Sequence, residues 1–185
     1  PVEQHQRNHL MEGIKNALPD DFIILSDSDE IPDFTKIKNI NLIKRFAAFS
    51  QKMFMYKLNL QNISESNWIG SKITRKKFIT SMQDLRNLKF KKYPLWRIDK
   101  YNQQIINGGW HFSFLQTPQQ ILTKIKSFSH GEFNSKNINE KKIEEKIIQN
   151  KDIFGRNTEL KKISINNDYP EYIIQNKDKL SNWII

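Results

Sequence analysis

The stretch FIILSDSDEIP, residues 22–32, decides the fold that the sequence predicts. Residues 22–25 are all apolar, which is typical of a short strand covered on both faces in an α/β sheet. Three carboxylates, Asp27, Asp29 and Glu30, follow this run. Because α/β domains bind ligands beyond the carboxyl ends of their strands, this acidic loop is a candidate site.

The rest of the sequence alternates between helical and extended patterns along one expected domain, residues 1–185. Apolar residues recur at helical spacing in several segments, and aromatic-rich or alternating segments lie between them. We expect helices at 3–18, 33–46, 75–88, 117–128 and 139–150 and after Pro170. We expect strands at 22–26, 47–61, 68–74 and 163–165, and two more within 103–115 around Gly108 and Gly109. The predicted fold class is α/β.

Composition restricts the chemistry of any site. Hydrophobic residues make up 37% of the chain and aromatic residues 11%, which is too apolar for a disordered protein. The chain has no cysteine, so disulfides and thiolate metal sites are excluded. Any metal would rest on carboxylates, histidines and main-chain oxygens, which suit Mg²⁺ and Mn²⁺. No apolar run approaches the roughly 20 residues of a transmembrane helix, so we expect a soluble protein.

The formal net charge of +10 invites comparison with nucleic-acid-binding proteins. The charges are scattered along the chain rather than gathered in one block, which argues against a dedicated nucleic-acid binder. A basic surface equally suits anionic substrates such as nucleotide sugars.

An Asp-x-Asp pair directly after a strand points to cation chemistry. Side chains alternate along an extended segment, so Asp27 and Asp29 are predicted to share one face. Together they can hold a divalent cation beside a diphosphate. The alternative is a solvated turn, and Asp33 is a candidate cap for the next helix. A phosphatase-type Asp nucleophile would have Thr or Val after the pair, whereas this chain has Glu30.

Further stretches turn this motif into a family resemblance. GGWHFSFL (108–115) and KIKSFSHGEFN (124–134) follow EQHQRNHL, IILSDSDEIP and WIGS in order. Together they resemble glycosyltransferase family 17. The resemblance implies a GT-A-like α/β/α sandwich around a mostly parallel sheet. It also implies that the first strands of the nucleotide-binding half would precede this chain, making it an N-terminally truncated fragment of one catalytic domain.

The resemblance implies an activity and a set of metal ligands. The expected reaction is inverting transfer of a sugar, GlcNAc, from a UDP-sugar donor to a glycan acceptor, with Mn²⁺ or Mg²⁺. Asp27 and Asp29 occupy the metal and diphosphate motif, with Asp29 as the more direct ligand. Glu30 extends the motif. His130 is the expected third metal ligand, and the alternative is a residue at the C-terminal end of a helix that interacts with the helix dipole.

The remaining candidates each have a structural alternative. Glu132 is a candidate general base or else a surface acid. His111 contacts metal, phosphate or acceptor, or is a hydrogen-bonded core residue. Trp110 stacks on a sugar or packs in the core, while Gly108 and Gly109 allow close approach of the backbone to a ligand.

Basic residues and the WIGS stretch complete the candidate set. Arg97 and Arg86 are candidate diphosphate contacts, with a surface role as the alternative. Arg7 and Asn8 either hold the donor or make helix contacts. Trp68 and Gly70 of WIGS are candidates for the edge of the acceptor cleft, on the strength of the resemblance.

Two other classes of function stay open at this point. One is a non-catalytic basic module that binds RNA or another anionic polymer, and the other is a metal-dependent phosphohydrolase. For the transferase, we expect a location in the cytoplasm, with peripheral contact to the inner membrane, or in the Golgi lumen of a eukaryote.

Overall fold

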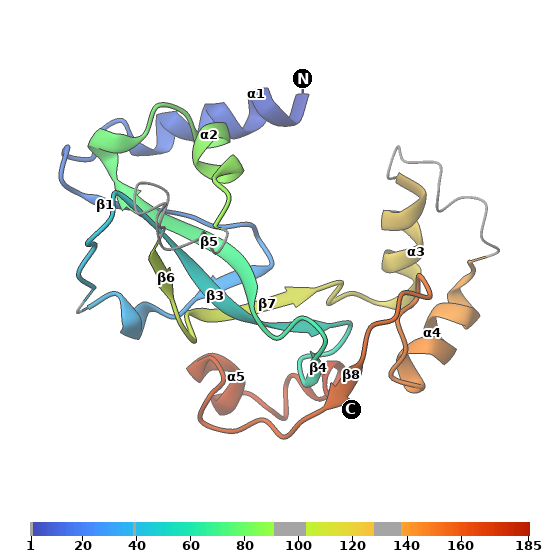
Figure 1. The fold of residues 1–185 in the computed structure, drawn as a ribbon. Coiled ribbons are helices and arrows are strands. Elements are labelled where there is room, and N and C mark those ends of the chain that lie inside the picture. Colours follow the sequence, from blue (N-terminus) through green and yellow to red (C-terminus); the bar gives the residue numbers. More distant parts are fainter. Residues whose placement is uncertain (1, 39, 91–102, 128–137) are drawn as a thin grey trace. The chain divides into compact units, whose positions relative to one another are not determined.

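The computed structural model describes residues 2–38, 40–90, 103–127 and 138–185. The chain divides into two compact units, both built from strands and helices, which confirms the α/β class (Figure 1). Unit 1 contains residues 1–51 and 68–109, and unit 2 contains residues 52–67 and 110–185. Strand β3 (Phe46–Met55) contributes its first half to unit 1 and its second half to unit 2.

The sheet of unit 1 has the strand order β1-β5-β3-β6. Its strands are β1 (Phe22–Leu25), β5 (Trp68–Arg75), the start of β3, and β6 (Gln103–Ile105). The β1–β5 and β5–β3 pairs are antiparallel, and the β3–β6 pair is parallel. The central strand β5 is therefore held on both sides, and most of its residues are buried.

Strand β1 is less buried than its apolar sequence predicts. Its one described partner is β5, so it lies at the edge of the sheet. Phe22 is 38% exposed and the three residues after it are half-buried. The prediction of a strand covered on both faces was wrong, because an apolar run by itself does not distinguish an edge strand from a central one.

The core of unit 1 lies on this sheet. Ala47, Phe49 and Ile73 are fully buried at its centre. The apolar residues packed against them come from β1, β6 and the loop before β3: Ile24, Ile37, Ile40, Leu42 and Ile105.

That loop corrects the prediction of a helix at 33–46. Asp33 does act as a cap, accepting a hydrogen bond from the Thr35 amide at 3.0 Å, but it caps only the short 3₁₀ helix η2 (Phe34–Lys36). Turns and bends follow until β3 begins. The apolar spacing of this segment reflects burial against the core rather than helical geometry.

The N-terminal segment forms α1 (Val2–His9) and the 3₁₀ helix η1 (Leu10–Ile14). The predicted helix 75–88 is split into the 3₁₀ helix η3 (Lys76–Phe78) and α2 (Met82–Asn87), which the Ser81 side chain caps. Helices α1 and α2 lie side by side (Figure 1). The Asn8 side chain accepts a hydrogen bond from the backbone amide of Gln83 at 3.2 Å, and Arg7 donates one to the side-chain carbonyl oxygen of Gln83 at 3.2 Å.

In unit 2, the second half of β3 pairs with β4 (Leu60–Asn62) and β7 (Gly109–Ser113), and β4 pairs with β8 (Leu160–Lys162). Its helices are α3 (Pro118–Ser127), α4 (Glu140–Ile148), α5 (Glu171–Gln175) and the 3₁₀ helix η6 (Ser181–Trp183). The hydrophobic core of unit 2 contains the buried residues Phe54, Leu58, Phe112, Tyr169 and Ile173.

The prediction of one strand at 47–61 fails at Tyr56, which has a φ of 65° and starts the turn between β3 and β4. Its buried hydroxyl donates to Asp152 Oδ2 at 3.1 Å and accepts from the Ile153 amide at 3.2 Å. Asp152 also accepts from the amide of Phe154 at 2.9 Å and from Arg156 Nη2 at 2.6 Å. Burial opposes ionisation of Asp152, but its hydrogen bonds with Arg156 outweigh burial and hold the carboxyl pKa below its usual value.

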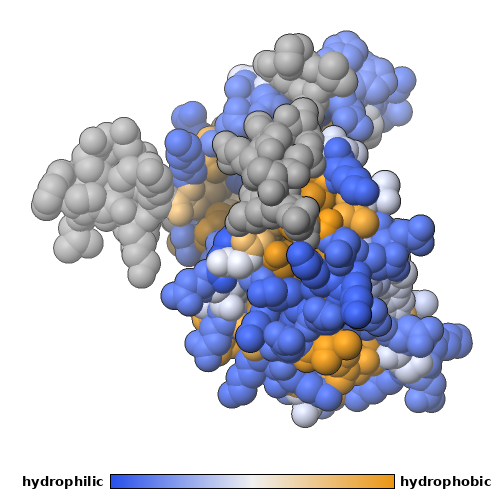
Figure 2. Space-filling view, turned by 90° about the vertical axis from the view of Figure 1, so that its right-hand side faces the viewer, coloured by the Kyte–Doolittle hydropathy of each residue, from blue (hydrophilic) through white to orange (hydrophobic). Residues whose placement is uncertain are grey.

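The resulting sheets are mixed, with four antiparallel and two parallel strand pairs among those described above. The mostly parallel sheet that the family resemblance implied is therefore not what the described residues form. Figure 2 shows one face of the molecule, where hydrophilic residues predominate around separate apolar patches. Among the described helices, none combines the length and apolar character needed to cross a bilayer.

Candidate functional site

The acidic residues after β1 lie in a tight turn of unit 1. The Glu30 amide donates to the Asp27 carbonyl at 3.0 Å, and β2 (Glu30–Pro32) begins where the turn ends. Residues 27–30 are therefore not an extended segment, and strand alternation does not set the directions of the Asp27 and Asp29 side chains. The prediction that these two residues follow strand geometry was wrong, because the chain reverses directly after β1.

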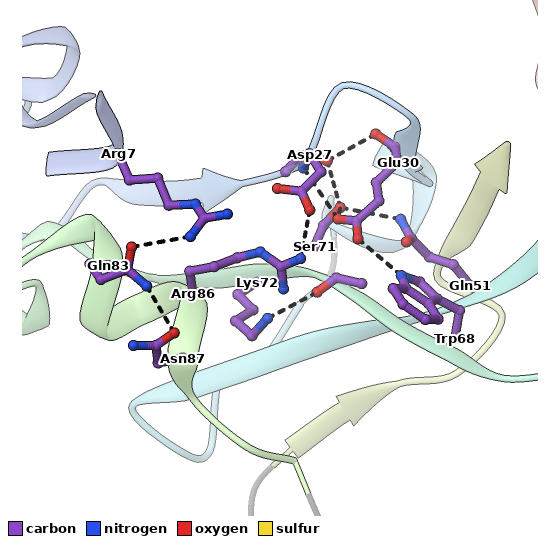
Figure 3. Close-up of polar contacts among 12 residues, drawn as sticks. Arg7, Asp27, Glu30, Gln51, Trp68, Ser71, Lys72, Gln83, Arg86 and Asn87 are labelled. Carbon is purple, nitrogen blue, oxygen red and sulfur yellow. Dashed lines mark hydrogen bonds and ion pairs between the residues drawn. The ribbon is translucent and has the colours of Figure 1, made fainter. Parts of the chain in front are cut away.

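Glu30 is the buried anchor of this turn, with 7% of its surface exposed. Its carboxylate accepts hydrogen bonds from Trp68 Nε1 at 3.0 Å, from Ser71 Oγ at 3.2 Å and from the Asp27 amide at 3.3 Å (Figure 3). Ser26 Oγ donates to the Glu30 carbonyl at 2.9 Å. A buried carboxylate is stable only when it is hydrogen-bonded in this way. Glu30 thus fixes the turn to β5, and its oxygens are occupied by protein donors.

Gly70 leaves the space that this arrangement needs. A Cβ atom at residue 70 would lie 1.9 Å from Gln51 Oε1 and 3.0 Å from the Glu30 carboxyl carbon. Gln51 is 1% exposed, and its Nε2 donates to Ser71 Oγ at 3.2 Å. The glycine of WIGS therefore lets β3 and β5 hold Gln51 and Glu30 together.

Cationic side chains lie beside the acidic turn. Arg86, on α2, donates from Nη2 to Asp27 Oδ2 at 2.6 Å, and 28% and 42% of these two side chains are exposed. Lys72, on β5, is 3% exposed, and its ammonium donates to the Gly70 carbonyl at 3.4 Å. Burial and the nearby charge of Arg86 hold the pKa of Lys72 below its usual value, against the weaker pull of Glu30 and Asp27.

The donor atoms at this turn can be tested against a divalent cation. Among the described residues, no group of three or more histidine or acidic side chains is close enough to hold a metal ion. The Glu30 carboxylate is buried and accepts three hydrogen bonds, so the more exposed carboxylates of the turn, Asp27 and Asp29, are the candidate ligands. Mg²⁺ is often bound by one or two carboxylates, with waters and substrate phosphates completing its shell. The turn fits that mode of binding and does not fit an all-protein metal cage.

Gly108 and Gly109 connect the second sequence motif to the acidic turn. The Gly108 carbonyl accepts from the Asp33 amide at 2.8 Å. Gly109 has a φ of 137°, and a Cβ atom there would lie 2.1 Å from the Ile31 carbonyl oxygen. The two glycines thus allow the close backbone approach that fixes the end of β2; a ligand contact by either stays a prediction.

The remaining sequence candidates belong to unit 2 or fall outside the described residues. His111 and Trp110 belong to β7 in unit 2, where His111 is 6% exposed and Trp110 Nε1 donates to the Asp168 carbonyl at 2.8 Å. Arg97, His130 and Glu132 lie outside the described residues.

Sequence reasoning missed two side chains of this site, Gln51 and Lys72. Both are polar residues inside strands that are otherwise apolar or buried, and this was the signal that could have identified them. Gln51 and Lys72 are 1% and 3% exposed, and a buried polar side chain needs a hydrogen-bond partner or a function.

Comparison with known proteins agrees with the motifs. The model of glycosyltransferase family 17 matches residues 1–163, which is most of the chain and includes the acidic turn and both glycines. Neither the curated proteins nor the solved structures gave a match to the chain. On the strength of the family match, the chain belongs to glycosyltransferase family 17.

Proposed function

We propose that this protein transfers GlcNAc from a UDP-sugar to a glycan acceptor with inversion, and that the donor diphosphate binds at the turn of residues 27–30. The observation that supports this location is the acidic turn itself, which Glu30 fixes to β5 and which contains Asp27 and Asp29. The chain belongs to a family of glycosyltransferases, and the proposed UDP-sugar donor carries a diphosphate. We further propose a GT-A-like catalytic domain, although the sheet is mixed.

Asp27 and Asp29 are the residues that would hold Mn²⁺ or Mg²⁺. A divalent cation at this position supplies neutralisation of the charge that develops on the departing UDP. Glu30 positions the turn through its hydrogen bonds and is not proposed as a ligand. His130 remains the proposed third ligand, on family resemblance alone.

The reaction requires one base and one leaving group. The acceptor hydroxyl oxygen forms a bond to the anomeric carbon, the bond from that carbon to the diphosphate oxygen breaks, and UDP leaves with the electron pair. A general base takes the hydroxyl proton. We propose Glu132 for this role and His111 for positioning the acceptor, both on family resemblance.

The test measures UDP release from UDP-GlcNAc with Mn²⁺ present and after chelation. Asp29→Asn is expected to lower metal-dependent release about 100-fold or more, since a cation supplies several kcal/mol at the transition state. Asp33→Asn is the matched control, because asparagine also caps helices and residue 33 lies outside the turn.

Full activity of Asp29→Asn would remove the proposed metal role. Release of inorganic phosphate instead of UDP would assign the site to a phosphohydrolase. Binding of RNA with a steep salt dependence, without any response to Mn²⁺ or to the donor, would indicate a binding module. UDP-glucose and UDP-galactose, assayed in parallel, test the choice of GlcNAc.

A further inference from the structure

Basic side chains lie beside the acidic turn, and binding of an uncharged sugar would not require them. Figure 3 shows Lys72 and Arg86 close to Asp27, and Arg7 reaching toward Gln83 of α2. Arg7 donates to Gln83, which lies on α2 three residues before Arg86 and so on the same face of that helix. The side chains of Lys72 and Arg86 lie next to each other in Figure 3, and burial together with the charge of Arg86 lowers the pKa of Lys72.

Lys72 has more hydrogen-bonding capacity than its surroundings use. An ammonium group has three donors, yet its one hydrogen bond within the described part of the chain is the 3.4 Å contact with the Gly70 carbonyl. The side chain is nevertheless 97% buried, as its 3% exposure implies. A buried cation with unused donors beside a second cation is costly, and the carboxylates of Glu30 and Asp27 offset this cost only in part. A further anion is therefore favoured there.

Arg86 uses only part of its guanidinium fork. Nη2 contacts Asp27 Oδ2, whereas Nε is buried and has no hydrogen-bond acceptor among residues 2–38, 40–90, 103–127 and 138–185. A guanidinium group binds phosphate through two parallel N–H donors. Nε and Nη2 of Arg86 form such a pair, and Asp27 occupies one of the two.

We propose that Lys72 and Arg86 form a phosphate-binding subsite that takes the donor diphosphate without a divalent cation, and that Asp27 holds Arg86 until the diphosphate arrives. This inference rests on the proposed function, because it assigns the diphosphate of that same donor. The phosphate oxygens replace the Asp27 carboxylate on Arg86 and supply acceptors for the Lys72 donors that no described residue engages. Asp27 is then released for the proposed cation.

The competing explanation is that Arg86 serves only to fix Asp27 in the fold. The two explanations differ in whether a gain in phosphate affinity from Asp27→Asn depends on Arg86. If Arg86 is a phosphate ligand restrained by Asp27, the substitution frees it, and phosphate affinity without metal rises. If Arg86 is structural, the substitution leaves no cation poised for phosphate, and any gain comes from the lost negative charge alone.

The experiment is isothermal titration calorimetry of the whole chain with pyrophosphate and with UDP, in the presence of EDTA. Arg86→Met and Lys72→Met are each expected to weaken pyrophosphate binding about tenfold or more, as the loss of a charged hydrogen bond implies. Arg86→Lys is expected to restore part of that loss. Lys161→Met, an exposed change on β8 with the same loss of charge, is the control and is expected to bind as the wild type does.

A double-mutant cycle tests the exchange at Asp27. Asp27→Asn is expected to strengthen metal-free pyrophosphate binding, and this gain is expected to disappear when Arg86→Met is added. A gain that persists with Arg86→Met would overturn the exchange. Thermal unfolding confirms that each variant is folded, and Lys72→Met is expected to fold because burial already disfavours the ammonium.

The outcomes separate this inference from the proposed function. Wild-type pyrophosphate affinity in both Arg86→Met and Lys72→Met overturns the subsite, even if UDP-GlcNAc is consumed. Pyrophosphate binding that depends on both residues supports the subsite, even if no UDP-sugar is consumed and the proposed reaction fails.

Discussion

Glu30→Gln tests whether Glu30 holds the acidic turn in place or binds the cation. The amide can still accept from Trp68, but its NH₂ group would face the Asp27 amide, which cannot accept, and the Ser71 hydroxyl, which must rotate to do so. Losing one hydrogen bond to a buried carboxylate costs about 1–3 kcal/mol. For a chain of this length, each kcal/mol lowers the melting temperature by about 2–4 °C, so we expect a fall of roughly 2–12 °C.

The assay is thermal unfolding followed by tryptophan fluorescence, with UDP affinity measured in Mn²⁺ on the same samples. Glu144→Gln, an exposed change on α4, is the matched control and is expected to shift the melting temperature little. We expect Glu30→Gln to change UDP affinity much less than Asp29→Asn does. An unchanged melting temperature combined with lost metal-dependent affinity would refute the reasoning and make Glu30 a ligand.

Three further predictions concern stability. Asp152→Asn is expected to lower stability at neutral pH by roughly 1–3 kcal/mol, because hydrogen bonds to a buried carboxylate are lost while its partner Arg156 is 56% exposed and screened by solvent. The pKa of Asp152 in the folded protein lies below its usual value of 3.8. The carboxylate therefore stabilises the fold above pH 3.8, and this stabilisation is lost as the pH falls through the depressed pKa. In urea titrations, the stabilities of the wild type and Asp152→Asn should converge in acid. Gly70→Ala is expected to destabilise the protein by over 1 kcal/mol through its clash with Gln51, and unaltered urea unfolding would contradict this. Burial raises the pKa of Tyr169, and its hydroxyl has no hydrogen-bond partner among the described residues. The protonated Tyr169 side chain therefore stabilises the fold fully below pH 10, and this stabilisation falls as the pH rises further. Tyr169→Phe should flatten that alkaline loss without lowering stability at pH 8, and an equal alkaline loss in both proteins would argue against the assignment.

Local signals predicted the elements whose ends are fixed by side chains. The helix predicted at 117–128 is present as α3, and Thr117 and Gln120 form a capping box at its start, with hydrogen bonds of 3.0 and 3.3 Å. Asn139 caps α4, and the glycine pair at 108 and 109 separates β6 from β7. Caps and turns act between residues near in sequence, so the sequence alone can reveal them.

The failures occur where distant residues decide the conformation. Ile37, Ile40 and Leu42 have helical spacing, but they pack on the core as a loop. The turn at Tyr56 depends on a hydrogen bond to Asp152, which lies 96 residues further along the chain. Periodicity reports which residues are buried, and it does not report the partners that bury them.

The candidate site was also predicted only in part. Asp27, Asp29 and Glu30 could be identified from their position after an apolar run. The structural role of Glu30 could not be predicted, because its hydrogen-bond partners Trp68 and Ser71 belong to a strand that begins 38 residues later.

A crystal structure of the chain with UDP and Mn²⁺ would show where the donor binds. We expect anomalous manganese density at Asp27 and Asp29, with the diphosphate between that ion and the side chains of Lys72 and Arg86. Manganese and diphosphate bound away from the turn of residues 27–30, with Arg86 still on Asp27, would contradict this expectation.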